Sequence, residues 1–287
     1  MRERAIQLGL LAMALGVLIA LGLISFFIFQ SGIALIARVG LWDFLSGTRW
    51  EPTAKPPQFG IFPMIVGSIW LTLGALLIGV PLGLAVAVFQ VELAPPWLAA
   101  VLRPTIQLLA GIPTVIYGFI GLTLLAPVVR GTLGGPGLSI FTGAIVLGIM
   151  ILPSIIAVSE DALRAVPPAM RDGATALGAT HWQMIGGMLL PTARSGIVAG
   201  VVLGMGRALG ETMAVIMMIG NALTIPRSPL DSATTLTSNI ALELAYASGP
   251  HREALFATGV VLFCMIMVLN AVATTLVRQG AFGRRMS

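Results

Sequence analysis

The feature that most constrains this fold is a series of long stretches without charged residues. Five stretches lack Asp, Glu, Lys and Arg, and they cover residues 5–37, 56–91, 104–129, 131–159 and 254–277. A sixth, residues 195–226, is uncharged except for Arg207 and Glu211. A helix that crosses the hydrocarbon core of a bilayer needs about 20 mostly apolar residues. Each stretch is therefore long enough to cross a membrane.

The composition argues against a soluble globule. Of the 287 residues, 57% are hydrophobic and only 9% are charged, whereas soluble domains carry about 25% charged residues. We predict an all-α integral membrane protein with six transmembrane helices, at residues 8–29, 62–90, 102–127, 139–158, 194–221 and 254–277. The first apolar run is much longer than the core of a signal peptide, so we expect it to be retained as a helix.

The spans divide the chain into three parts. Residues 1–60 form the first helix and a periplasmic loop, residues 61–278 form a five-helix core with a cytoplasmic loop at 159–193, and residues 279–287 form a cytoplasmic tail. The side that holds both termini carries nine Lys and Arg residues against six on the other side. Because cytoplasmic loops carry the excess of positive charge, both termini are predicted to be cytoplasmic.

Patterns for catalysis and metal binding are missing from the sequence. An ATP-binding loop ends in Gly-Lys-Ser/Thr, but the only lysine is Lys55, between Ala54 and Pro56. His181 and His251 fall in loops on opposite faces, and Cys264 is the single cysteine. A zinc site needs about four clustered ligands, so we expect no metal, no cofactor and no catalytic residue on this chain.

The cytoplasmic loop contains a short helical pair with a defined pattern. Pro167 and Pro168 suit a helix start, and Gly178 suits the left-handed turn that ends a helix. A second helical segment is expected to run to Leu190 and stop at Pro191. The loop should therefore form a compact protrusion outside the membrane.

In this loop the chain resembles the membrane subunits of ABC importers. Their motif is Glu-Ala-Ala, three residues, Gly, nine residues, Ile, any residue, Leu-Pro. This chain keeps that spacing, with Asp for Glu, Gly for Ala and Met for Ile, at Asp172, Gly173, Ala174, Gly178, Met188, Leu190 and Pro191. The resemblance implies a type I ABC importer permease fold and a loop that docks on a separate ATPase. The alternative is an ordinary connecting hairpin.

Further segments resemble the C-subunit permeases of phosphate-specific (Pst) ABC importers. They are FLSGTRWEP, FGIFPMIVGSIWLT, ELAPPW, AGIPTVIYGF and RALGETMAV, spread over residues 44–215. The resemblance implies a phosphate-importing permease in the bacterial inner membrane. Its implied partners are a homologous A subunit, two copies of an ATPase that binds ATP and Mg, and a periplasmic phosphate-binding protein. Nucleic acid is not among them. The alternatives are a permease for molybdate, tungstate or sulfate, and a non-transporting membrane scaffold or sensor.

Three glycines set the direction of the charged pair in the fifth span. Gly196, Gly200 and Gly204 recur every four residues, and they allow another helix to approach closely. Arg207 follows Gly200 by seven residues and Glu211 follows Arg207 by four, so on one helix all would share nearly one face. We therefore expect the pair to point toward protein or a cavity.

The charges have a structural and a functional interpretation. Arg207 is expected midway along its span, where a lipid-facing charge costs at least ~3 kcal/mol. A Glu and an Arg at this spacing can form an ion pair, but such a buried pair stabilises little. A pathway for an anion explains the charges better, because a guanidinium offers a planar fork to two phosphate oxygens. Glu211 would hold Arg207 in position and accept a hydrogen bond from the remaining proton of hydrogen phosphate.

Three polar residues complete the predicted substrate pathway. Thr114 and Tyr117 follow Pro113 in the third span, where they line a pore or accompany a simple helix kink. Thr212 lies near the charged pair, where it contacts substrate or hydrogen-bonds between helices.

Overall fold

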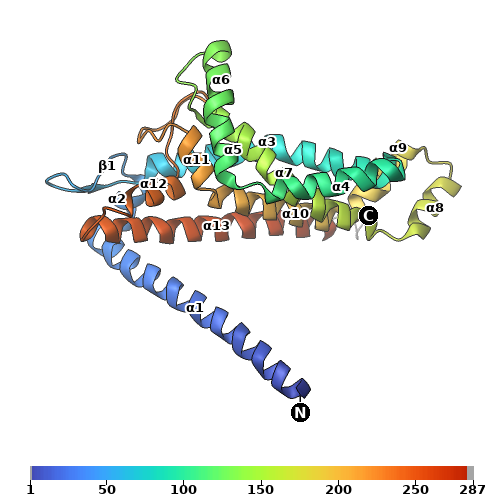
Figure 1. Ribbon diagram of the computed structural model, residues 1–287, viewed down its shortest axis with the longest axis horizontal. Helices are drawn as coiled ribbons and strands as arrows, with labels where there is room; N and C mark the ends of the chain where they lie inside the picture. The colour runs from blue at the N-terminus through green and yellow to red at the C-terminus, as the bar shows by residue number, and fades with distance from the viewer. Residues whose placement is uncertain (1, 283–287) are drawn as a thin grey trace.

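The computed structural model describes residues 2–282, and nearly all of its ordered elements are helices (Figure 1). The elements in chain order are α1 (Arg2–Val39), α2 (Leu41–Ser46), β1 (Trp50–Glu51), β2 (Gln58–Phe59), α3 (Phe62–Val88), the π-helical turn η1 (Phe89–Leu93), α4 (Pro96–Gly111), α5 (Thr114–Ile120), the π-helical turn η2 (Gly121–Leu125), α6 (Ala126–Leu133), α7 (Ile140–Arg164), α8 (Pro168–Ala176), α9 (His181–Met184), the π-helical turn η3 (Ile185–Leu189), α10 (Leu190–Gly210), α11 (Met213–Met218), α12 (Leu236–Glu243) and α13 (Pro250–Phe282).

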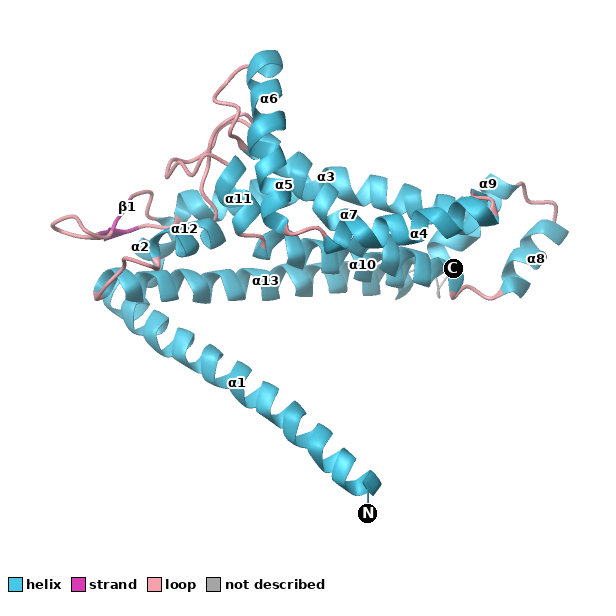
Figure 2. Cartoon of the chain, in the orientation of Figure 1, coloured by secondary structure: helices cyan, strands magenta, loops and turns pink. Residues whose placement is uncertain are grey.

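The described residues contain six helical segments long and apolar enough to cross a membrane, which confirms the predicted number. They cover Gly9–Val39, Phe62–Leu93, Thr114–Leu133, Ile140–Arg164, His181–Gly210 and Pro250–Thr275. The strands β1 and β2 form one short antiparallel hairpin, and Figure 2 shows that β1 lies at one end of the bundle, beside α2 and α12. Of the expected tail at 279–287, residues 279–282 continue α13 and residues 283–287 lie outside the described part.

The bundle is built around α7, which packs between α3 and α10. Its inward side chains, such as Leu147, Ile151 and Ile155, are fully buried. The glycine stripe of α10 faces this helix: a Cβ on Gly196 would clash with the Cβ of Ala162. A Cβ on Gly204 would lie 2.9 Å from Cγ1 of Ile155. Small residues thus let α10 approach α7 closely.

The first helix is longer than expected and only partly packed. The expected span ends at residue 29, but α1 continues to Val39 because the apolar run continues. Its last turns pack against α13, where the rings of Phe29 and Phe263 meet edge to face at 5.5 Å. Its first half diverges from the bundle (Figure 1), and a Cβ on Gly9, Gly16 or Gly22 would meet nothing within 4 Å.

The predicted third span, 102–127, is wrong because the chain breaks inside it. α4 ends at Gly111, and Ile112 and Pro113 are extended before α5 starts at Thr114. A proline disfavours the helical conformation of the residue before it, which explains the break at this position. The membrane-spanning segment is instead Thr114–Leu133, at a steep angle to the long helices (Figure 1).

The predicted fifth span, 194–221, is also wrong at both ends. A helical segment begins at His181, behind a capping box made by Thr180 and Gln183, and continues through Pro191 to Gly210. Pro191 does not stop the helix because it sits in the first turn of α10, directly after η3. A proline is tolerated there since its missing N–H is not needed.

Two ends of the bundle differ in content. The α8 end carries the loop 159–193 with α8 and α9, and the α12 end carries α2, the β hairpin and α12 (Figure 1). The short helix α12 starts at a capping box formed by Thr235 and Ser238. The α12 end is also held by Glu243, whose Oε2 lies 2.6 Å from His251 Nε2 and accepts from Trp50 Nε1 at 2.9 Å.

Candidate functional site

Arg207 and Glu211 belong to two different elements, although four residues separate them. Arg207 lies in the last turn of α10, and not midway along a span as expected. Glu211 follows the helix in an extended conformation, with φ −68° and ψ 131°. Both side chains are partly buried, and the described residues contain no ion pair between them. The expectation that one helical face carries both residues is therefore wrong.

Glu211 is held by the next two elements of the chain. Its carboxylate accepts a hydrogen bond from Ala214 N at 3.3 Å, in the first turn of α11. Its backbone carbonyl accepts from Thr237 Oγ1 of α12 at 3.0 Å. Thr212, between the two helices, donates from Oγ1 to the carbonyl of Gly210 at 3.1 Å. The break between α10 and α11 is thus fixed by local hydrogen bonds and not by an Arg–Glu pair.

Tyr117 of α5 is brought to the same region. Its ring is buried, and its hydroxyl donates to the carbonyl of Leu109 at 2.9 Å, across the break between α4 and α5. A Cβ on Gly118, next to Tyr117 in α5, would lie 2.9 Å from the Cα of Ala214 in α11. Thr114 is partly buried at the start of α5. The packing of α5 on α11 therefore joins the break between α4 and α5 to the break that follows Arg207 in α10.

The loop 159–193 folds as a helical pair joined at a glycine. α8 begins at Pro168 and Gly178 follows it with φ +80°, so the left-handed turn predicted at Gly178 is confirmed. Asp172 and Gly173 are exposed, and Leu177 is 91% exposed. Met188 and Leu190 instead pack against the buried cluster around Leu163 and Leu189. The loop therefore presents its first helix outward and anchors its second segment in the bundle.

One ion pair joins α8 to the transmembrane bundle. Arg171 of α8 contacts Glu92 of η1, with Nη2 3.1 Å from Oε1, and donates to the carbonyl of Leu163 at 2.9 Å. The Glu92 side chain is only 8% exposed. Because a buried carboxylate needs a partner, this contact ties the position of α8 to the end of α3.

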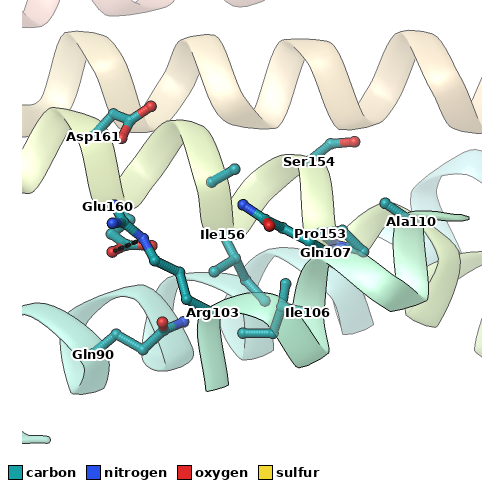
Figure 3. A pocket seen from close by; sticks show the side chains of 11 residues that line it. Gln90, Arg103, Ile106, Gln107, Ala110, Pro153, Ser154, Ile156, Glu160 and Asp161 are labelled. Carbon is teal, nitrogen blue, oxygen red and sulfur yellow. Dashed lines mark ion pairs between the residues drawn. The ribbon is translucent and has the colours of Figure 1, made fainter. Parts of the chain in front are cut away.

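A cavity of about 370 Å³ lies at the α8 end of the bundle (Figure 3). Its lining comes from η1, α4 and α7. The polar residues that line it are Gln90, Arg103, Gln107, Ser154, Glu160 and Asp161. Arg103 reaches from α4 to Glu160 on α7, with Nε 3.1 Å from Oε1. The sequence alone does not indicate that these residues form one group, because they are spread over three elements.

The family follows from a comparison with known proteins. The family described as binding-protein-dependent transport system inner membrane component matches residues 79–287, which is more than half of the chain. This chain belongs to that family. Among the binding-protein-dependent transport components, the phosphate transport system permease protein PstC of Haemophilus influenzae is 36% identical over an alignment of 285 positions, which covers 88% of this chain and 90% of that protein. The probable ABC transporter permease protein YqgH of Bacillus subtilis is 44% identical over 234 residues, which is 80% and 76% of the two chains.

A solved structure of a bacterial alginate ABC transporter, in complex with its alginate pentasaccharide-bound periplasmic protein, shares the fold of this transport component. It covers 93% of this chain and 94% of its own, with a TM-score of 0.62 and 19% identity. The predicted type I ABC importer permease fold is therefore confirmed. As a binding-protein-dependent transport component, the chain is a permease subunit and not an enzyme.

Proposed function

We propose that this chain is the C-type permease subunit of an ATP-driven phosphate importer. The single observation that carries the substrate is the similarity to PstC permeases over nearly the whole chain, at 36% identity over 88% of it. An oxyanion also fits the charged region, since a guanidinium provides fixed charge and a donor fork for tetrahedral oxygens. A molybdate, tungstate or sulfate permease, or a scaffold, lacks such support.

In this proposal Arg207 contacts the travelling anion. It lies in the last helical turn before the break between α10 and α11, and irregular backbone at membrane depth is tolerated where it lines a cavity or is buried in protein. Tyr117, Thr114 and Thr212 line the same region. Glu211 moderates the attraction, because a passage site must bind weakly enough to release its ion. It also accepts a hydrogen bond from the proton of hydrogen phosphate.

The loop 159–193 is the proposed contact with the ATPase. The helix α8 presents Asp172 and Gly173 on its exposed side, while Ala174 packs against the bundle, and the apolar side chains of Met170 and Leu177 are 40% and 91% exposed. Such exposed apolar residues outside the transmembrane segments mark a surface that a partner covers. ATP and Mg bind on that partner and not on this chain.

The remaining proposals concern assembly and orientation. A homologous A subunit completes the pathway, two ATPase copies dock at the α8 end, and a periplasmic phosphate-binding protein docks at the α12 end. Both termini lie in the cytoplasm, as the excess of Lys and Arg on their side indicates.

The proposal predicts that Arg207→Gln abolishes phosphate uptake. The measurement is ATP-dependent uptake of labelled phosphate by vesicles that contain all four kinds of subunit, compared with the unchanged importer. Assembly and ATP binding should persist, because no described residue pairs with Arg207 in an ion pair. Uptake at the original rate would remove Arg207 from the pathway, and loss of assembly would assign it a structural role.

A further inference from the structure

Gln90 occupies a place in the bundle that packing alone does not explain. The residue is 3% exposed, and neither its amide nitrogen nor its amide oxygen has a hydrogen-bond partner among the described residues. A buried amide without partners destabilises a protein, whereas an apolar side chain of similar size would fill the same space without that cost. An unpaired buried polar group therefore needs an explanation, and a ligand is one.

The Gln90 side chain lines the cavity between η1, α4 and α7. Figure 3 shows its amide pointing toward the side chain of Arg103, with Gln107 and Glu160 around the same space. The cavity volume, about 370 Å³, falls at the lower end of the range for small-ligand sites, about 300–1,000 Å³. The space is therefore large enough for a small hydrated ion.

The cavity offers both donors and an acceptor. Arg103 contacts Glu160 through Nε, so its terminal nitrogens remain at the cavity, and its side chain is 52% exposed. Arg164 also makes its closest contact with Oε1 of Glu160, at 3.0 Å. Oε2 of Glu160 is then the oxygen that remains to accept a hydrogen bond. Gln107 and Ser154 add neutral groups that can donate or accept.

The charges at the cavity balance each other. Arg103 and Arg164 offset Glu160 and Asp161, so the site has no excess of positive charge that would hold every anion. Recognition must then depend on which hydrogen bonds the ligand can make. A ligand that presents acceptor oxygens to Arg103 and the Gln90 amide nitrogen, and one hydroxyl that donates to Glu160, pairs each of these three groups.

Hydrogen phosphate has this combination at neutral pH, and sulfate does not. Sulfate would place a bare oxygen against the Glu160 carboxylate. A phosphodiester in a lipid headgroup also lacks a P–OH group, so the buried acceptor favours inorganic phosphate over a lipid as the source of the ligand.

We propose that this cavity is a second, inner binding subsite for a protonated tetrahedral oxyanion. Arg103 and the amide nitrogen of Gln90 donate to the oxyanion, and Oε2 of Glu160 accepts a hydrogen bond from its hydroxyl group. The proposal rests on phosphate import as the function of the chain. It adds a site near the α8 end that binds a protonated oxyanion in preference to an unprotonated one.

The subsite also lies next to the link between α8 and the bundle. Gln90 and Glu92 both belong to the turn η1, and Glu92 is the carboxylate that Arg171 of α8 contacts. Movement of α8 would therefore shift the turn that carries the Gln90 amide.

The test compares Gln90→Leu with Gln30→Leu in the complete importer. Gln30 is an exposed glutamine of α1 and serves as the matched control. Because Leu removes an unpaired polar group, we expect Gln90→Leu to raise the Tm of the importer or leave it unchanged. We expect the KM for phosphate uptake in vesicles to rise about tenfold, the size expected for one lost hydrogen bond to a charged ligand.

Glu160→Gln provides a second readout that folding alone would not change. We expect sulfate to inhibit phosphate uptake weakly in the unchanged importer and at least several-fold more strongly in Glu160→Gln. Binding of labelled inorganic phosphate to the purified importer with Arg207→Gln, without the binding protein, should persist and then be lost when Gln90→Leu is added.

The outcomes separate this inference from the proposed function. If the unchanged importer takes up no phosphate, the proposed function fails. If it does, but Gln90→Leu matches Gln30→Leu in KM and Glu160→Gln leaves sulfate inhibition unchanged, the inner subsite alone is overturned. A phospholipid that native mass spectrometry finds bound to the unchanged importer and lost in Gln90→Leu would also overturn it, in favour of a lipid site.

Discussion

Arg207 is stabilised by its place at the end of a helix. It lies in the last turn of α10, where the partial negative charge of the helix C-terminus stabilises a cation by roughly 0.3–1 kcal/mol. The Glu211 carboxylate accepts a hydrogen bond from Ala214 N, in the first turn of α11. The two residues are therefore held independently. Neither needs the other to be tolerated, and both are free to respond to an ion.

The substitution Gly196→Ala tests the packing of α10 on α7, because it adds one methyl group between the two helices. A Cβ there would clash with Ala162, whereas a Cβ on Gly206 of the same helix would meet nothing within 4 Å. We expect Gly196→Ala to destabilise the importer by about 1–3 kcal/mol, as overpacking does. Gly206→Ala should be neutral or mildly stabilising, because alanine favours helix by up to about 1 kcal/mol over glycine.

The measurement is thermal unfolding of the purified importer carrying each substitution. A Tm for Gly196→Ala that equals that of Gly206→Ala would show that α10 and α7 are not packed as closely as described.

At the scale of elements, the turn η1 and the helix α8 are joined by two charged groups. Removing Arg171 leaves the buried Glu92 carboxylate without its partner, and breaking a buried pair in this way costs about 3–5 kcal/mol. Removing both partners together is less harmful, because no unpaired charge remains.

We therefore expect Arg171→Met to impair transport more than the double variant Arg171→Met with Glu92→Met. The measurement is a double-mutant cycle on phosphate taken up per ATP hydrolysed. Additive effects of the two single substitutions would indicate that the contact does not join the elements.

The joint between α8 and α9 depends on a left-handed residue. Gly178 has φ +80°, and a β-branched residue is strained in that conformation. We expect Gly178→Val to leave ATP hydrolysis active while phosphate uptake falls at least several-fold, because α8 would no longer be held at its angle. Gly131→Ala, at an exposed helical position of α6 with nothing within 4 Å of the added Cβ, should leave both activities unchanged. Full coupling in Gly178→Val would contradict a role of this joint.

The sequence predicts which segments are apolar, but not where they break. The stretch 104–129 contains the break at Pro113, and the stretch 195–226 contains the break at Glu211, without any change in overall hydropathy. Pro113 was a usable signal for the first break. The second depends on the carboxylate of Glu211 bonding to α11 and on Thr237 of α12, which are tertiary contacts.

The cavity group was hidden for a similar reason. Gln90, Arg103 and Glu160 each lie near the end of an uncharged stretch, where polar residues are usually taken as markers of the membrane boundary. Only the packing of η1, α4 and α7 brings them together. An isolated glutamine just before the end of the run 56–91 was the one sequence signal available.

At the scale of the whole molecule, the chain is one permease subunit of a larger transport system. The helices α4 and α5 expose apolar side chains such as Leu108 and Phe119, and the first half of α1 leaves the bundle (Figure 1). The two helix breaks and the inner cavity divide the bundle into an Arg207 region and an α8 end. Alternating access would expose the ion at the first region and then at the second.

The most direct test of phosphate import is a competition experiment on the complete importer in vesicles. Labelled phosphate is given to the vesicles together with ATP, and unlabelled phosphate, sulfate or molybdate is added in excess. We predict that uptake requires ATP, that unlabelled phosphate suppresses it, and that sulfate and molybdate suppress it far less. Suppression by sulfate or molybdate equal to that by phosphate, or uptake without ATP, would contradict the account.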